Sequence, residues 1–217
     1  MSEAQTTQPT AKRAIVYIDG FNLYYGALKN GPYKWLNLER LFCRLRPHDE
    51  VQRIRYFTAK IVGPHAANQD AYLLALESLP LVDVIFGRFK AKQVQCRVLG
   101  CPKPGHRIFS TYEEKRTDVN IAIWMLNDAQ RDLCDRLILV SGDSDLVPAI
   151  FMVKELFPEK EIIVYIPAIT QVRGAALELR AAAHKHRILP LDLLPKSQFP
   201  AQVQLGSGAV VRKPPTW

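Results

Sequence analysis

AIVYIDG, residues 14–20, is a run of apolar residues that stops at an aspartate and a glycine. A short, continuous apolar run bounded by a turn residue is typical of a strand buried on both faces of a parallel sheet. The stretch LILV, residues 137–140, repeats the pattern and runs directly into SGDSD, residues 141–145. Both segments therefore predict buried strands that end in acidic residues.

Helical and extended segments alternate along the chain. Apolar runs predict strands over 14–18, 51–61, 82–89, 137–140, 161–166 and 187–191, and helical spacing, composition and end signals predict helices over 22–29, 38–45, 66–79, 118–131, 146–157 and 172–184. Alternation of this kind predicts an α/β fold with a mainly parallel sheet and helices on both faces. We expect right-handed crossovers between the strands.

Three features divide the chain into one domain and two tails. Residues 1–12 are polar at their start and predict a disordered N-terminal tail, and residues 13–193 predict the folded domain. Residues 194–217 contain prolines, scattered polar residues and a basic end, which predicts a flexible basic C-terminal tail. Within the domain, residues 91–112 hold Gly and Pro and predict a loop or hairpin over the strand ends.

The charge balance favours a polyanionic partner. The net charge is +8 and the pI is about 9.4, which favours nucleic acid, although a mildly basic protein without such a partner is equally compatible. Residues 84–116 hold eight basic residues against Glu113 and Glu114, so this stretch carries +6 of that charge. The chain has no long apolar run, no signal peptide and no dense disulfide framework, so we expect a cytoplasmic protein with reduced thiols and no membrane partner.

Four aspartates fall where a strand should end or a helix should begin: Asp19, Asp118, Asp143 and Asp145. The carboxyl ends of the strands in an open α/β sheet line one edge, where ligands bind. Carboxylates gathered there repel one another, and a hard divalent cation such as Mg²⁺ relieves that repulsion. The sequence therefore predicts a metal site in an otherwise basic protein.

Each of these acids also has a simpler interpretation. Asp19 is a plausible helix N-cap, although Asn22 is the stronger cap candidate by position, which leaves Asp19 free. A cap with a tight turn after the strand at 137–140 needs one acid, whereas Asp143 and Asp145 supply two. Asp118 alone fits a solvated, charged loop before a helix. The three motifs together favour the metal site.

A second metal site is a weaker hypothesis. Cys96, Cys101 and His106 are separated by four residues each, which resembles part of a zinc site. The spacing is loose and the fourth ligand, Cys134 or His65, has to come from elsewhere. Isolated cysteines and a loop histidine are the better interpretation.

Three motifs in order resemble a known domain: IDGFNLY at 18–24, KRTDVN at 115–120 and LVSGDSD at 139–145. Together they resemble the NYN domain, a branch of the PIN-like nuclease superfamily, and look closest to its bacterial LabA-like group over residues 14–168. The resemblance implies a PIN-like three-layer sandwich and an acidic site that binds Mg²⁺ or Mn²⁺ and cuts single-stranded or structured RNA. It implies that Asp19, Asp118, Asp143 and Asp145 are catalytic metal ligands, with Asn22 as a polar residue beside them.

The leading hypothesis is a metal-dependent endoribonuclease. The metal would lower the pKa of a bound water for in-line attack on the phosphodiester. The expected nucleic-acid contacts are Tyr24, stacked on a base, together with Lys90, Lys92, Lys115, Arg116 and Ser141. The sequence leaves homo-oligomers open.

Two other functions remain. A non-catalytic RNA-binding or regulatory scaffold module has the same fold and the same pocket. A phosphatase of the haloacid dehalogenase type needs a second acid two residues after Asp19, where this chain has Phe21.

Overall fold

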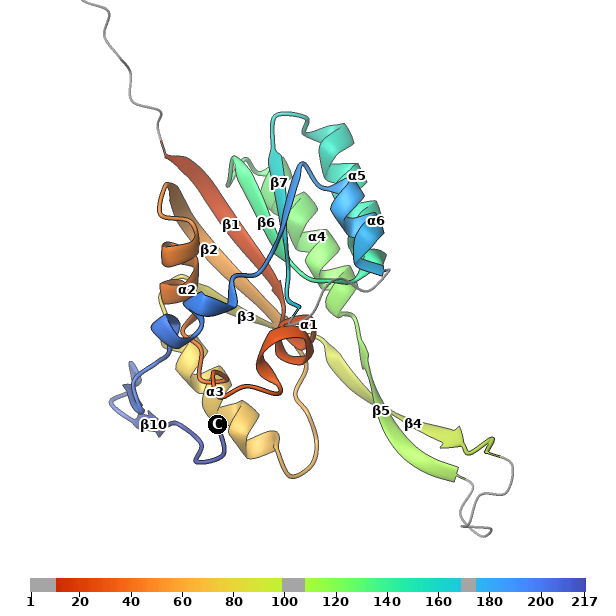
Figure 1. The fold of residues 1–217 in the computed structure, drawn as a ribbon, viewed down its shortest axis with the longest axis vertical. Helices are drawn as coiled ribbons and strands as arrows, with labels where there is room; N and C mark the ends of the chain where they lie inside the picture. Colours follow the sequence, from red (N-terminus) through yellow and green to blue (C-terminus); the bar gives the residue numbers. More distant parts are fainter. Residues whose placement is uncertain (1–10, 99–107, 169–174) are drawn as a thin grey trace, which may run out of the picture.

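A six-stranded sheet forms the centre of the protein, whose computed structural model describes residues 11–98, 108–168 and 175–217 (Figure 1). The strand order is β3-β2-β1-β6-β7-β8, and every neighbouring pair is parallel. The strands are β1 (Lys12–Asp19), β2 (Asp49–Thr58), β3 (Val82–Phe86), β6 (Arg136–Val140), β7 (Glu161–Ile166) and β8 (Lys185–Ile188). The predicted α/β sandwich with a parallel sheet is confirmed.

Helices cover both faces of the sheet. One face carries α1 (Gly20–Leu23), the π-helix η1 (Tyr24–Leu28), α2 (Leu38–Leu45) and α3 (Ala66–Glu77). The other carries α4 (Thr117–Gln130), the 3₁₀ turn η2 (Ser144–Leu146), α5 (Val147–Leu156) and α6 (Ala175–Ala182). None of the helices described is both long and apolar enough to cross a bilayer.

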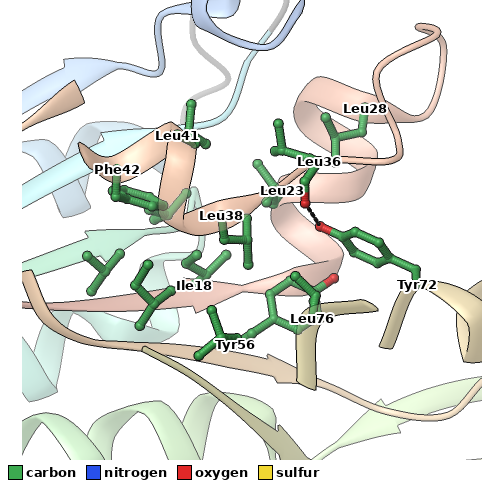
Figure 2. Packing of buried hydrophobic residues seen from close by; sticks show 14 of the residues in the cluster. Ile18, Leu23, Leu28, Leu36, Leu38, Leu41, Phe42, Tyr56, Tyr72 and Leu76 are labelled. Atoms are coloured by element: carbon green, nitrogen blue, oxygen red, sulfur yellow. Dashed lines mark hydrogen bonds between the residues drawn. The ribbon is translucent and has the colours of Figure 1, made fainter. Parts of the chain in front are cut away.

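Two separate cores hold these layers together, because successive side chains of a strand point to opposite faces. Ala14, Val16 and Ile18 of β1 pack in the core beneath α1, α2 and α3, part of which Figure 2 shows. Ile15 and Tyr17 pack beneath α4, α5 and α6. The five-residue apolar run is therefore buried on both sides, as the sequence predicts.

A two-stranded hairpin leaves the body of the protein at the carboxyl edge of the sheet (Figure 1). It consists of β4 (Arg88–Gln95) and β5 (Ile108–Lys115), which pair antiparallel. The predicted strand over 82–89 is thus two strands, because the chain leaves the central sheet after Phe86. Of the two possibilities for 91–112, the structure has the hairpin. Cys101 and His106 of the possible zinc site lie outside the described residues.

The segment after residue 193 differs from the predicted flexible tail. Beyond the 3₁₀ turn η3 (Leu191–Leu193), it forms the turn η4 (Pro195–Ser197) and the paired strands β9 (Gln202–Gln204) and β10 (Val210–Arg212). Trp35 anchors it, with ring centroids 5.7 Å from Phe199 and 6.4 Å from Trp217 and a 2.8 Å hydrogen bond from Nε1 to the Pro200 carbonyl. Contacts of a few apolar side chains order this segment despite its Pro-rich composition. That composition has no hydrophobic periodicity from which strands could have been predicted. Of the predicted N-terminal tail, residues 1–10 lie outside the described residues, and β1 begins at Lys12.

Candidate acidic site at the carboxyl edge of the sheet

Asp19 lies at the centre of the site, at the end of β1. From β1 the chain builds β2 and β3 on one side and β6, β7 and β8 on the other, so the crevice between β1 and β6 is the topological switch point where α/β sheets bind ligands. The Asp19 side chain caps α1, because its Oδ1 accepts a 2.9 Å hydrogen bond from the Asn22 backbone N–H. The expectation that Asn22 is the cap is therefore wrong, yet Asp19 still faces the crevice edge with 2% of its surface exposed.

Asn22 and Ser141 tie the ends of β1 and β6 together. Asn22 Nδ2 donates to Asp19 Oδ2 at 2.5 Å, and Asn22 Oδ1 accepts from the Gly142 N–H at 3.2 Å. Ser141 Oγ donates to Asp19 Oδ2 at 3.2 Å and accepts from the Asp143 N–H at 3.1 Å. Ser141 is fully buried, so its assignment as a nucleic-acid contact is wrong: it holds Asp19 and the following loop in place.

Asp143 and Asp145 differ in their roles. Asp143 caps η2, since its Oδ1 accepts a 3.0 Å hydrogen bond from the Asp145 N–H. Asp143 is half-buried beside Asp19, whereas the Asp145 side chain is exposed. Both acids follow β6, as predicted, and Asp143 is close enough for its charge to contribute to the raised pKa of Asp19.

Asp118 and Glu114 reach the crevice from the base of the hairpin. Asp118 lies in the first turn of α4, after Arg116, which has a left-handed backbone with φ of 80°. A non-glycine residue in that region is strained, and such strain clusters at functional sites. Gly87 lets the hairpin base lie close to β3: a Cβ there would be 2.7 Å from Thr117 Oγ1 and 3.3 Å from Glu114 Oε1.

The pKa values show that these acids share one electrostatic environment. Burial first, and then Asp19, Asp118 and Asp143, raise the pKa of Glu114 to about 7. Burial, Asp19, Asp143 and Asp145 raise the pKa of Asp118 to about 6. Burial also raises the pKa of Asp19 against the opposing hydrogen bonds from Asn22 and Ser141. No ion pair joins any of these acids to a Lys, Arg or His within the described part of the chain.

Glu114 is a member of the site that sequence reasoning missed. The sequence shows Glu113 and Glu114 only as two adjacent acids in a basic stretch, but strand residues alternate between opposite sides. Glu113 faces the lysines, with 2.9 Å to Lys115 and 3.6 Å to Lys92, so Glu114 faces inward. Recognising a strand over 108–115 would have separated the two glutamates.

The donor atoms of this site fit a hard divalent cation. All are carboxylate or amide oxygens, the ligands that Mg²⁺ prefers, and Glu114 Oε1 is buried with no hydrogen-bond partner. Within the described residues, no three His, Cys, Asp or Glu side chains are already arranged around a common point as a metal site. Mg²⁺ keeps several waters and needs few direct protein ligands when a phosphate completes its shell, so some of these acids would act through water.

The residues expected to contact nucleic acid lie on the hairpin, at its base and on η1. Lys90, Lys92, Lys115 and Arg116 are all exposed on the hairpin or at its base. Tyr24 is half-buried on η1, with its ring edge-on to Tyr25 at 5.3 Å. Phe21 and Phe89 connect α1 to the hairpin, with ring centroids 5.4 Å apart. Lys115 and Arg116 therefore lie at the base of the hairpin, next to Glu114 and Asp118 in the chain, whereas Lys90 and Lys92 lie farther along the hairpin.

The sequence matches the profile described as NYN domain over residues 13–190. This chain therefore belongs to the NYN domain family, a branch of the PIN-like nuclease superfamily. The match covers the whole central sheet and both helical layers. The LabA-like subgroup stays a prediction.

Two further likenesses accompany the family match. The chain is 30% identical over 206 residues to the 6-hydroxy-3-succinoylpyridine 3-monooxygenase of Pseudomonas putida; the match covers 81% of this chain but 66% of that protein, just under two thirds of its length. A crystal structure of a protein of unknown function from Vibrio parahaemolyticus aligns with a TM-score of 0.57 and 18% identity, covering 86% of this chain and 98% of that one. The second likeness concerns the fold alone.

Proposed function

We propose that this protein is a divalent-metal-dependent endoribonuclease. The observation that carries the proposal is a set of acids at the switch point of the sheet that no basic side chain in the described structure neutralises. Mutual repulsion of this kind is relieved by a bound cation. The family membership supports phosphodiester cleavage as the chemistry that uses such a cation.

The residues divide the work as follows. Asp19, Asp118 and Asp143 would hold Mg²⁺ or Mn²⁺, and Glu114 and Asp145 would complete the shell directly or through water. The ion supplies an activated water and neutralises charge on the leaving oxygen. Asn22 and Ser141 fix the Asp19 carboxylate through the hydrogen bonds described above.

The surroundings of the site favour a long polyanion over a small phosphate ester. Phosphate groups of a nucleic-acid backbone are held by Lys and Arg, and Lys90, Lys92, Lys115 and Arg116 lie along or beside the hairpin. At the place where a phosphatase of the haloacid dehalogenase type has its second acid, Phe21 packs on Phe89. An RNA strand that follows the hairpin would reach the acids at its base.

A labelled-RNA cleavage assay with Mg²⁺, Mn²⁺ or EDTA tests the proposal. We expect metal-dependent products from the wild-type protein and a loss of about 10²-fold or more in Asp143→Asn, because losing a metal ligand removes several kcal/mol of transition-state stabilisation. Asp70→Asn is the matched control, since Asp70 lies on α3 and is exposed. Undiminished cleavage by a folded Asp143→Asn protein contradicts the assignment. RNA binding without any metal-dependent product favours the non-catalytic alternative.

A second candidate is hydroxylation of a small nitrogen heteroaromatic compound. The observation in its favour is the 30% identity to a protein named for that activity. The direct test is incubation with 6-hydroxy-3-succinoylpyridine, dioxygen and a reduced nicotinamide cofactor, followed by chromatography of the products. A hydroxylated product that Asp143→Asn does not form would replace the nuclease proposal.

A further inference from the structure

A cavity of about 450 Å³ lies directly beside the acidic site, on the side of the sheet that α1 and α3 cover. Its walls come from α1 and η1, the end of β2, α3 and the residues Thr216 and Trp217. Figure 1 shows the end of the chain beside α3, below α1. The cavity and the acidic site share a wall: a Cβ on Gly20 would be 2.8 Å from the Tyr56 hydroxyl, and Asp19 precedes Gly20.

The walls are aromatic and basic. Six aromatic side chains line the cavity: Phe21, Tyr24, Tyr25, Tyr56, Tyr72 and Trp217. Lys29, Lys34 and His65 lie among them, and Lys29 Nζ is 4.8 Å from the centre of the Tyr25 ring. None of the described residues that line the cavity is acidic. Because its charged side chains are basic, the wall favours an uncharged or negatively charged occupant.

The hydroxyls of Tyr72 and Tyr56, two tyrosines of the cavity wall, differ in whether they have a hydrogen-bond partner. The Tyr72 hydroxyl donates a 2.9 Å hydrogen bond to the Leu36 carbonyl, which Figure 2 shows as a dashed line. The Tyr56 side chain is 7% exposed, and its hydroxyl makes no hydrogen bond within the described structure. This hydroxyl is not among the described polar atoms that are buried without a partner, so it opens onto the cavity that Tyr56 lines. Tyr56 therefore presents an unused donor and acceptor to whatever fills the cavity.

We propose that this cavity holds the base of one nucleotide of the RNA, stacked on Trp217 and Tyr24 and hydrogen-bonded by Tyr56, with its phosphate toward the acidic site. The inference rests on the proposed function and adds a substrate-binding subsite to it. The volume lies within the range of about 300–1,000 Å³ typical of small-molecule pockets and admits one nucleotide rather than a helix. Aromatic faces receive any base, and one polar group such as Tyr56 adds a preference among bases.

Through Trp217, the segment after residue 193 forms one wall of the proposed base-binding cavity. Its ring lies 5.6 Å from that of Tyr72, and Asn68 Nδ2 donates to Thr216 Oγ1 at 3.1 Å, which fastens the end of this segment to α3. The aromatic cavity is therefore completed by a part of the chain outside the NYN match at 13–190. Family members that differ there would have a different pocket.

Equilibrium binding of the four ribonucleosides in EDTA tests the subsite without cleavage or metal, and without a phosphate that the acids would repel. We expect binding by wild type and by Asp143→Asn alike, and a loss of about 5- to 150-fold in Trp217→Ala, since stacking contributes about 1–3 kcal/mol per base. Tyr56→Phe, which keeps the ring, should weaken the binding of at least one of the four nucleosides by about 5-fold. Tyr112→Ala, on the exposed hairpin, is the control and should bind as wild type does.

Three outcomes separate this proposal from the proposed function. Equal binding by wild type and Trp217→Ala overturns the subsite whatever the cleavage assay gives. Binding of pyridine-3-carboxylate, lost in Trp217→Ala, with no nucleoside binding, assigns the cavity to small aromatic acids instead. Nucleoside binding that depends on Trp217, in a protein without metal-dependent cleavage, supports the subsite and contradicts the nuclease proposal.

Discussion

The two edges of the central sheet carry similar numbers of acids in opposite electrostatic conditions. At the amino edge, Asp49, Asp132, Asp135 and Glu161 are paired with Arg13, Arg46, Arg136, Lys12, Lys160 or Lys185. At the carboxyl edge, Asp19, Glu114, Asp118 and Asp143 have one another for neighbours. The pKa of Glu161 is lowered to about 2, mainly by hydrogen bonds from Lys185 and Arg136 that outweigh its burial, whereas the pKa of Glu114 is raised to about 7.

This contrast separates structural acids from functional ones. The acids of the amino edge form ion pairs with Lys and Arg, whereas within the described residues no Lys, Arg or His forms an ion pair with the acids of the carboxyl edge. Unneutralised buried acids lower stability, so their presence at the switch point, where ligands bind, favours a role in binding a cation. The amino edge is neutralised by the protein's own cations, and we expect the carboxyl edge to be neutralised by a bound one.

Unpairing the amino edge should give the largest effect. Arg136 contacts both Asp49 and Glu161, so Arg136→Met leaves two buried carboxylates short of a cation. We expect a loss of about 3 kcal/mol in the free energy of unfolding, at the lower end of the range for a broken buried pair because Arg46 and Lys185 remain. Denaturant unfolding measures it, and Lys12→Met, an exposed partner of the same Glu161, should cost less than about 1 kcal/mol. Equal effects from the two variants would contradict the distinction.

Supplying a cation should stabilise the carboxyl edge selectively. At a Mn²⁺ concentration of about 100 times its Kd, binding adds about 2.7 kcal/mol, or a rise of roughly 5–10 °C in Tm for a protein of this size. Asp143→Asn should lose most of that rise and Asp132→Asn, at the amino edge, should keep it. Thermal melts with Mn²⁺ and with EDTA make the comparison. A rise of equal size in both variants would place the ion elsewhere.

The two edges should respond to pH in opposite directions. The pKa of Glu114 is raised, so the metal-free protein loses stability as pH rises from about 4.5 to about 7, where the folded carboxyl gives up its proton. The pKa of Glu161 is lowered to about 2, so its contribution is present above about 4.5 and is lost as pH falls toward 2. The measurement is the free energy of unfolding in EDTA across this pH range. Glu114→Gln should remove the decrease in stability between about pH 4.5 and 7. Glu161→Gln should remove the decrease in stability as pH falls from about 4.5 toward 2. Metal affinity should fall below pH 7 for the same reason, because the ion competes with a proton.

Removing one carboxyl-edge charge should have the smallest effect, and a favourable one. Asp118→Asn relieves repulsion from Asp19 and Asp143, which together with burial raises the pKa of Asp118 to about 6. We expect the metal-free protein to gain about 0.5–1 kcal/mol at pH 7 while cleavage falls, the trade-off typical of functional sites. Denaturant unfolding in EDTA measures the gain in stability, and the cleavage assay measures the loss of activity. A destabilised Asp118→Asn protein would instead make Asp118 a structural cap.

The fold was largely predictable because its signals are local. Five consecutive apolar residues in β1 and four in β6 predict strands buried on both faces, and the alternation with helices fixes the parallel sheet. The ends of β1 and β6 are local too, so Asp19, Asp143 and Asp145 were predicted at the right edge. The segment after residue 193 was not, because its order comes from contacts with Trp35 and Tyr72 that are more than 100 residues away.

By itself, the sequence determined which segments become strands, which acids follow β1 and β6 at the carboxyl edge and which family the motifs resemble, since each depends on residues a few positions apart. Only the tertiary structure decided that Asp19 rather than Asn22 caps α1, that Ser141 is buried behind Asp19, that Glu114 turns inward and that Trp217 completes a cavity beside the acids. Those facts depend on which side chains meet across the crevice. Burial, charge repulsion and hydrogen bonding act through space, and the order of residues along the chain does not contain those distances.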